Sequence, residues 1–204
     1  MTLLNNFLFI ALPYISLSVF LIGTIYRYRS RKFTYSSLSS QFLETRKLYW
    51  GSLPFHWGIT LLFFGHLVAF LFPQTILLWN QQPVRLLILE ITAFVFGIMT
   101  FAGLLNLFYR RIKELRIRKV TSLMDIILEV LLIAQVFLGI WVAYSYRWGS
   151  SWFAIVLSPY LSSIFNLSPK IDAVIMLPLI VQFHLIGGFL IIMFIPFTRL
   201  VHFL

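Results

Sequence analysis

The apolar residues of this chain gather in five long runs separated by shorter and more polar segments. We place the runs at residues 4–26, 51–73, 84–108, 123–145 and 174–198. Each supplies roughly 20 mainly apolar residues, the number that a helix needs to cross about 30 Å of hydrocarbon. The connections leave no room for a water-soluble catalytic domain. The pattern therefore predicts an all-α membrane protein, a five-helix transmembrane bundle in which residues 1–204 form a single domain.

Composition agrees with this class and narrows the chemistry. The chain is 60% hydrophobic and 11% charged, far from the usual composition of a soluble domain. It has no cysteine, which excludes disulfides, iron–sulfur clusters, thiolate metal sites and covalent c-type haem attachment on this chain. The net charge of +10 does not indicate nucleic-acid binding, because the basic residues cluster in two loops between apolar runs. Histidine remains as the strong metal ligand.

Lysine and arginine are divided very unevenly between the two sides of the expected bundle. Thirteen of the sixteen fall in the first and third connections or after the fifth run, and three, Arg85, Arg147 and Lys170, fall on the other side. Cytoplasmic loops carry the excess of these residues. We therefore expect a multi-pass protein of the cell (inner) membrane, with its N-terminus outside and its C-terminus in the cytoplasm.

Two further segments bear on the topology. No positive charge precedes the first run, so we expect it to remain as a span rather than be removed as a signal peptide. The segment from Tyr146 to Lys170 is long, aromatic and poor in charge. We expect it to lie along the outer interface rather than to cross the membrane.

All four histidines lie on, or at the end of, the second and fifth runs: His56 and His66 on one, His184 and His202 on the other. An ionisable side chain in a membrane span is costly and usually faces the bundle interior, so each is a candidate functional residue. A single histidine could serve only as a hydrogen-bonding group between helices. Four histidines arranged as two pairs on two helices point instead to metal ligands.

The spacing of the histidines predicts which ones pair. On ideal helices His56 and His66 are about 15 Å apart along the axis, and His184 and His202 about 27 Å apart. The two spans run in opposite directions, so His56 is level with His202 near the cytoplasm and His66 with His184 nearer the outside. The two separations along the helix axes differ by about 12 Å, so the helices or the haem planes must tilt. Pro196 can supply a bend between the two histidines of the fifth run. Each pair can then hold one haem iron.

Haem suits this ligand set better than zinc does. A structural zinc site usually has four protein ligands and a catalytic site three, whereas two neutral imidazoles match the axial positions of haem. Gly58, Gly65, Gly187 and Gly188 lie near the histidines. They either leave flat space for the ring or serve ordinary helix packing.

Two motifs carry a family resemblance. The second run contains FHWGITLLFFGHL, and the last part of the sequence reads FHLIGGFLIIMFIPFTRLVHF, so that the two histidines of the first motif are ten residues apart and those of the second are eighteen residues apart. With these motifs, and with an RYRSRK loop after a tyrosine-containing first span, the chain resembles the gamma subunit of membrane-bound respiratory nitrate reductase, a five-span dihaem cytochrome b. The resemblance covers nearly the whole length.

The resemblance implies two haems b, an inner one held by His56 and His202 and an outer one held by His66 and His184. It also implies a respiratory-chain role in which quinol is oxidised near the outer haem. Electrons then pass to an iron–sulfur beta subunit and a molybdenum-containing catalytic alpha subunit on the cytoplasmic side. No substrate-reductase site is expected on this chain.

We expect quinol to bind near Gly65, His66, Arg85 and Glu90. The family has a lysine near the outer start of the third span, where this chain has Arg85, whose planar guanidinium stays charged and donates differently. Glu90 is expected either to accept a quinol proton as a general base or to be a satisfied interfacial carboxylate.

Arginines at the cytoplasmic ends of the spans are candidates for the propionates of the inner haem. Arg110, Arg111 and Arg199 end helices there. They can pair with propionates or contact lipid phosphate. Asp125 suits the start of the fourth span, where the helix dipole stabilises a carboxylate, and Gln135 is expected to hydrogen-bond across the bundle.

Two other functions stay open at this point. The chain is a haem-free membrane anchor or proton transporter if its histidines relay protons. Alternatively, the same haem relay runs in the reverse direction, from a partner that oxidises nitrite or a sulfur compound, because sequence does not set redox potentials.

Overall fold

The part of the chain that the structure describes consists of helices, turns and short connections. The computed structural model describes residues 2–30, 46–198 and 200, and no strand occurs among them. In chain order the elements are α1 (Leu3–Asn6), η1 (Phe7–Ala11), α2 (Leu12–Ser30), α4 (Arg46–Leu71), α5 (Pro73–Asn80), α6 (Pro83–Lys113), α7 (Leu115–Arg118), α8 (Leu123–Ser145), α9 (Gly149–Trp152), η3 (Phe153–Leu157), α10 (Ser158–Phe165), η4 (Val174–Met176), α11 (Leu179–Phe194) and η5 (Ile195–Phe197).

Five helical segments are long and apolar enough to cross a membrane. They are Leu3–Ser30, Leu48–Leu71, Pro83–Lys113, Leu123–Ser145 and Leu179–Phe197. Each overlaps one of the five runs expected from the sequence, so the all-α bundle with five membrane-spanning helices is confirmed. Large apolar side chains along these helices, such as those of Leu21, Val95 and Trp141, are exposed, as expected of a surface that faces lipid.

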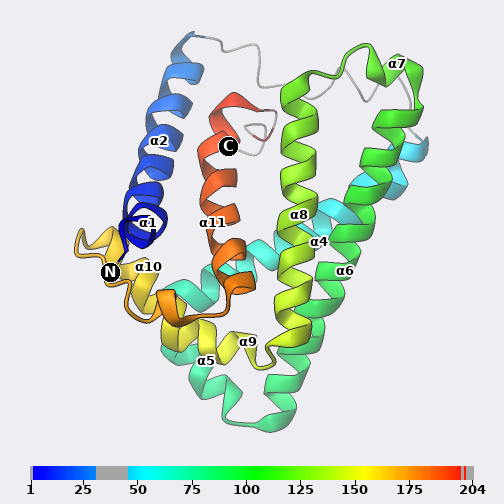
Figure 1. Ribbon diagram of the computed structural model, residues 1–204. Coiled ribbons are helices and arrows are strands. Elements are labelled where there is room, and N and C mark those ends of the chain that lie inside the picture. Colours follow the sequence, from blue (N-terminus) through cyan, green and yellow to red (C-terminus); the bar gives the residue numbers. More distant parts are fainter. Residues whose placement is uncertain (1, 31–45, 199, 201–204) are drawn as a thin grey trace.

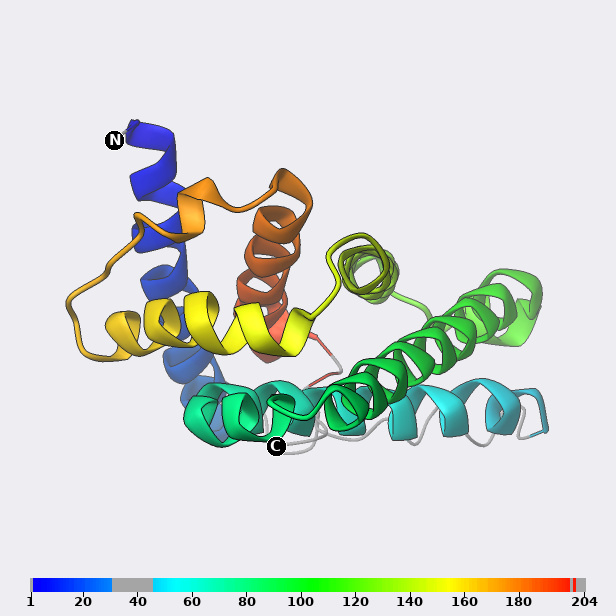
Figure 2. The same ribbon diagram turned by 90° about the horizontal axis from the view of Figure 1, so that it is seen from below.

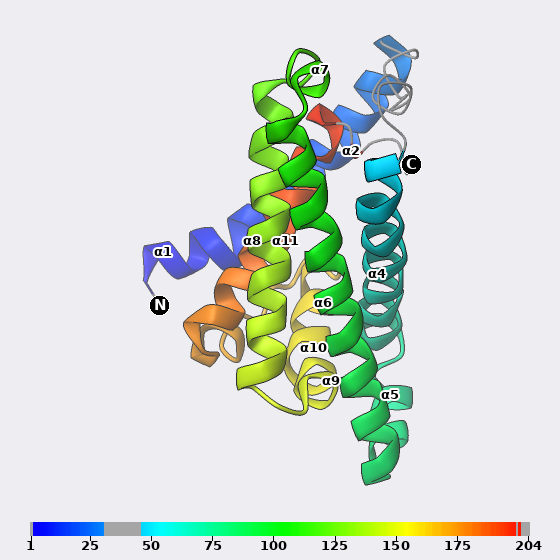
Figure 3. The same ribbon diagram turned by 90° about the vertical axis from the view of Figure 1, so that its right-hand side faces the viewer.

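The spans pack in an order that differs from their order in the chain. α4 packs against α6, α6 against α8, α8 against α11, and α11 against α2 (Figures 1 and 3). The short elements η3 and α10 also contact α4. The two helices with the described histidines, α4 and α11, are therefore separated in this packing order by α6 and α8.

Short helices close one end of the bundle. α9, η3 and α10 follow one another and run across this end rather than along the spans (Figure 2). The end of α2 and the helix α7 lie at the opposite end (Figure 1). The course of α9 to α10 agrees with a segment that lies along an interface instead of crossing it.

A buried cluster attaches this transverse segment to the first and last spans. The Tyr160 hydroxyl donates to the Phe9 carbonyl at 2.8 Å, and the Tyr14 hydroxyl donates to the Ile164 carbonyl at 3.0 Å. Burial raises the pKa of Tyr160 far above its usual value, which keeps the hydroxyl protonated as a donor. The buried members are Phe9, Leu12, Leu157, Tyr160, Ile164, Ile171, Val174 and Phe189.

The α4–α6 contact is close because glycines face it. A Cβ atom at Gly103 would lie 2.6 Å from the Phe55 nitrogen and 2.8 Å from the Gly51 oxygen, both backbone atoms of α4. A Cβ atom at Gly58 would lie 2.9 Å from the Phe96 oxygen of α6. Of the two roles expected for Gly58, space for a haem ring or ordinary helix packing, the structure therefore favours helix packing.

The fourth span begins at a capping box. The Ser122 hydroxyl accepts from the Asp125 amide at 3.2 Å, and the Asp125 carboxylate accepts from the Ser122 amide at 3.0 Å. Two of the N–H groups that a helix start leaves without partners are thus satisfied. Asp125 lies in the first turn of α8, as expected.

The fifth span differs from its expected course at both ends. It starts at Leu179, after Pro178, because the apolar residues Val174–Met176 form a separate 3-10 turn. It ends at Phe194, and the 3-10 turn with Pro196 leads into extended backbone at Thr198. Proline has no N–H to continue the ladder. A straight helix from His184 to His202 was therefore the wrong expectation, although Pro196 does interrupt the helix. His202 lies outside the described residues.

Replacing Gly103 with alanine should lower the free energy of unfolding by about 1–3 kcal/mol, the usual cost of overpacking. The new methyl group meets backbone atoms of α4, which cannot turn away. Thermal unfolding in detergent, followed by circular dichroism, measures the change. Gly97→Ala on the same helix is the control, because its methyl would meet only the Ile140 side chain, at 3.3 Å. Equal stability of both variants would contradict the close α4–α6 contact.

Candidate functional site

The three described histidines share one arrangement of the imidazole ring. In each, Nδ1 lies within hydrogen-bond distance of a backbone carbonyl oxygen. A carbonyl oxygen only accepts, so Nδ1 carries the hydrogen and donates it, and Nε2 is the nitrogen with the lone pair. Histidines that bind metal usually donate their second ring nitrogen in this way. The pairs are His56 with Ser52 at 2.7 Å, His66 with Leu62 at 2.8 Å, and His184 with Gln135 at 3.1 Å.

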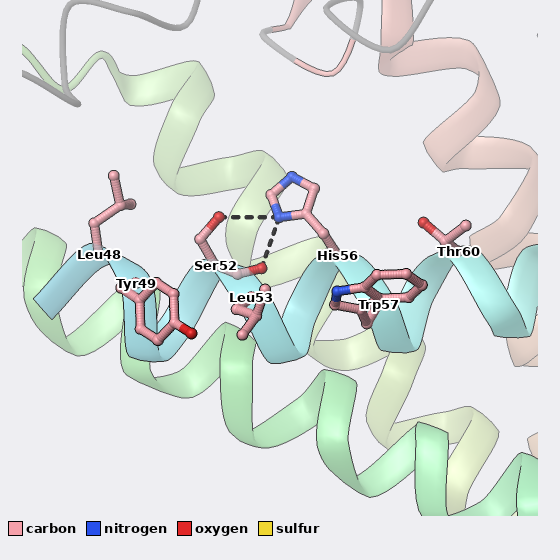
Figure 4. A pocket seen from close by; sticks show the side chains of 7 residues that line it. All are labelled: Leu48, Tyr49, Ser52, Leu53, His56, Trp57 and Thr60. Atoms are coloured by element: carbon pink, nitrogen blue, oxygen red, sulfur yellow. Dashed lines mark hydrogen bonds between the residues drawn. The ribbon is translucent and has the colours of Figure 1, made fainter. Parts of the chain in front are cut away.

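His56 borders a surface cavity of about 480 Å³ on α4. Its ring rises from the same side of the helix as Ser52, whose hydroxyl lies 3.0 Å from Nδ1 (Figure 4). Nε2 is on the far side of the ring from the helix (Figure 4). The lining is Leu48, Tyr49, Ser52, Leu53, His56, Trp57 and Thr60. The expected partner His202 lies outside the described residues, so the inner pair stays a prediction.

His66 lies on α4 and His184 on α11, so the pair expected to hold the outer haem comes from two different spans. The His66 ring also meets the Phe153 ring edge-on, with centroids 5.7 Å apart and planes 84° apart. Beside it, a Cβ atom at Gly65 would have no neighbour within 4 Å. The face of α4 at Gly65 is therefore open in the described part of the chain.

The cross-bundle hydrogen bond expected of Gln135 is present, and it goes to His184. The Gln135 side-chain amide donates to the His184 carbonyl at 2.9 Å. Sequence reasoning did not connect these two residues, because 49 positions separate them and only the α8–α11 packing brings them together. The sequence feature that could have indicated this contact is a glutamine followed four residues later by a glycine, Gln135 and Gly139, on the same face of α8.

Arg85 and Glu90 were expected at one site, and the structure directs them to different partners. The Glu90 carboxylate accepts from the Gly149 and Ser150 amides at 3.2 and 2.8 Å and from the Ser150 hydroxyl at 2.6 Å. The exposed Arg85 guanidinium lies 5.3 Å from the centre of the Trp79 ring. For Glu90 this favours the alternative of a satisfied carboxylate, here at the start of α9.

Of the three arginines considered for propionates, two are described. The Arg111 Nε atom lies 2.6 Å from the Glu129 carboxylate, and its Nη1 atom lies 3.8 Å from that of Asp125. This ion pair joins the end of α6 to the start of α8. Arg110 is buried, with 6% of its surface exposed. Arg199 lies outside the described residues, and the propionate role of all three stays a prediction.

Arg27 has a structural role beyond setting the orientation. Its Nη1 atom donates to the carbonyls of Pro196 and Thr198, each at 2.7 Å. One turn earlier on α2, a Cβ atom at Gly23 would lie 2.8 Å from the Pro196 Cβ. α2 thus holds the turn that leads towards His202. The charge pattern alone did not reveal this contact, because it depends on where α11 ends.

Known proteins resemble this chain along nearly all of its length. The family model described as nitrate reductase gamma subunit matches residues 5–204. The nitrate reductase gamma chain of Bacillus subtilis (strain 168) is 31% identical over 200 residues, covering 94% of this chain and 87% of the relative. The respiratory nitrate reductase 2 gamma chain of Escherichia coli (strain K12) is 31% identical over 205 residues, covering 98% of this chain and 89% of the relative.

Replacing Glu90 with alanine should lower the free energy of unfolding by about 1–3 kcal/mol, because the amides at the start of α9 lose their acceptor. Glu90→Gln should cost less, since its amide oxygen can still accept from the Ser150 amide and hydroxyl while the Gly149 amide loses its acceptor. Thermal unfolding in detergent, with limited proteolysis between α8 and α10, compares the two. A glutamine variant as unstable as the alanine variant would contradict the hydrogen-bonding role.

Proposed function

The chain belongs to the nitrate reductase gamma subunit family, and we propose that it oxidises quinol and relays the electrons through two b haems to its partner subunits. Membership makes it a multi-pass membrane subunit of a nitrate reductase complex. The observation that carries the proposal is the shared orientation of His56, His66 and His184. Each donates Nδ1–H to a backbone carbonyl, so that Nε2 is the ligand nitrogen.

The residues of this chain suit two bis-histidine haem sites. His66 and His184, from two different spans, would hold the outer haem. His56 and His202 would hold the inner one. When bound, haem supplies the one-electron redox chemistry, while the protein supplies ligands, orientation and a low dielectric. Gly65 leaves the neighbouring face of α4 open to a bound group.

For the quinol site we propose the surface next to Gly65 and His66, with Arg85 at its outer edge. Arg85 is exposed, and its guanidinium can donate to a quinol oxygen while the Trp79 ring limits its movement. Glu90 contributes indirectly: it fixes the start of α9, which continues into η3 and places Phe153 against His66. Proton acceptance by Glu90 is the less favoured role, because its carboxylate already accepts three hydrogen bonds.

The charge distribution sets the orientation that we propose for the bundle, and with it the end at which the partner subunits would dock. The basic helix α7 and the end of α2 lie at one end of the bundle, and α5, α9 and α10 lie at the other (Figure 1). By the excess of lysine and arginine, the α7 end faces the cytoplasm, and the N-terminus lies outside. The iron–sulfur beta subunit and the molybdenum-containing alpha subunit would dock at the α7 end. Arg110, Arg111 and Arg199 would lie near the inner propionates there, with Arg111 shared with Glu129.

The purified complex should contain two haems b per gamma chain, and His66→Ala or His184→Ala should remove the outer one. The haem content then halves, because a single imidazole does not complete the axial pair. A pyridine haemochrome titration and a reduced-minus-oxidised spectrum measure it. Gln182→Ala, a polar change on the same helix as His184, should leave both haems. A colourless wild-type protein would overturn the proposal and favour the haem-free anchor or transporter.

Arg27→Leu should lower the content of the inner haem and spare the outer haem. The change removes hydrogen bonds to the carbonyls of Pro196 and Thr198, each worth about 1.5–3 kcal/mol for a charged donor, in the turn that precedes His202. Arg29→Leu on the same helix removes the same charge and serves as the control. Redox titration resolves the two haems. Equal loss of both haems in Arg27→Leu would count against this role.

A further inference from the structure

His184 and Gln135 hold each other by two hydrogen bonds of opposite direction. The His184 ring donates Nδ1–H to the Gln135 carbonyl at 3.1 Å, and the Gln135 amide donates to the His184 carbonyl at 2.9 Å. Each residue is thus both donor and acceptor for the other. The pair fixes the separation and the relative rotation of α8 and α11 at this level of the bundle.

A glycine gives the imidazole access to the α8 backbone. Gly139 lies four residues after Gln135, on the same helix face, where a side chain would cover the Gln135 carbonyl. A Cβ atom at Gly139 would lie 2.9 Å from Cε1 of the His184 ring, closer than such contacts occur. The hydrogen bond from His184 Nδ1 therefore depends on the missing side chain at position 139.

A second glycine makes room for the glutamine amide. A Cβ atom at Gly187 would overlap Oε1 of Gln135. This oxygen is buried and has no hydrogen-bond partner among the described residues, so the amide is held through its donated hydrogen bond. Gly187 therefore serves the contact with Gln135 rather than the space for a flat ring.

His184 differs from the other two described histidines in the origin of its acceptor. His56 and His66 donate to carbonyls four residues earlier on their own helix, those of Ser52 and Leu62. His184 donates to a carbonyl of another span. Its ring orientation is therefore set by the packing of α8 against α11.

We propose that Gln135, Gly139 and Gly187 form a positioning clamp for His184, which fixes its Nδ1–H tautomer and leaves Nε2 as the nitrogen that can bind the outer haem. The clamp rests on the proposed function, in which His184 binds the outer haem. Donation from Nδ1 raises the basicity of the ligand nitrogen and so favours the oxidised iron. The clamp thereby keeps the midpoint potential of the outer haem lower than it would be without this hydrogen bond.

The test compares Gly139→Ala and Gln135→Met with the control Gly97→Ala in the intact complex. Gly97 lies at the α6–α8 contact, where a Cβ atom would be 3.3 Å from the Ile140 side chain and would have no described histidine within 4 Å. We measure the midpoint potentials of both haems by redox titration and the low-spin ferric signal by electron paramagnetic resonance. Gly139→Ala should shift the outer haem to a more positive potential and alter its signal. Gln135→Met should give a smaller shift in the same direction, and the inner haem and the control should not change.

Four outcomes decide between the clamp and its premise. Selective loss of the outer haem in Gly139→Ala supports the clamp, and if that variant does not assemble, Gln135→Met decides alone. Unchanged outer potential and signal in a haem-replete Gln135→Met and Gly139→Ala overturn the clamp and leave the proposed function intact. Equal shifts of both haems also overturn it. Wild-type complex without a bis-imidazole haem signal overturns the proposed function itself.

Discussion

The structure depends on one constraint: a polar hydrogen inside a membrane bundle needs an acceptor within the protein. For an imidazole that we propose binds iron through one nitrogen, this constraint decides what the other nitrogen does. In His56, His66 and His184 the acceptor is a backbone carbonyl, and the ring orientation follows from it. The same hydrogen bond satisfies the donor and presents the ligand nitrogen.

Polar side chains at the helix contacts turn out to position other elements. Arg27 holds the turn at Pro196, Glu90 holds the start of α9, and Arg111 joins α6 to α8 through Glu129. From the sequence, Arg27 contributes to the expected orientation. Glu90 is either a proton acceptor or a satisfied carboxylate, and Arg111 either pairs with a propionate or contacts lipid phosphate. In a low-dielectric bundle, however, an ionised group that finds partners inside the protein fixes the geometry around it.

Much of the fold could be predicted from the sequence, because a span of about 20 apolar residues leaves little choice of structure. The candidate ligands could also be named, since histidine is so costly in such a span. Their surroundings could not: Gln135 and His184 are 49 positions apart, and only packing shows that Gly139 lies under the imidazole. The break at Pro196 shows how an ideal-helix estimate fails where one residue lacks an amide hydrogen.

The packing order of the spans has a consequence for biogenesis. α4 and α6 are joined by the short helix α5 and pack closely through Gly103, so this hairpin can form as soon as both have left the ribosome. The proposed haem pairs each take one ligand from α4 and the other from α11 or the segment after it. Cofactor capture is then a late event, which waits for the last span to arrive beside α8. Until that moment the proposed α4 ligands, His56 and His66, lack the second histidines that the proposal requires.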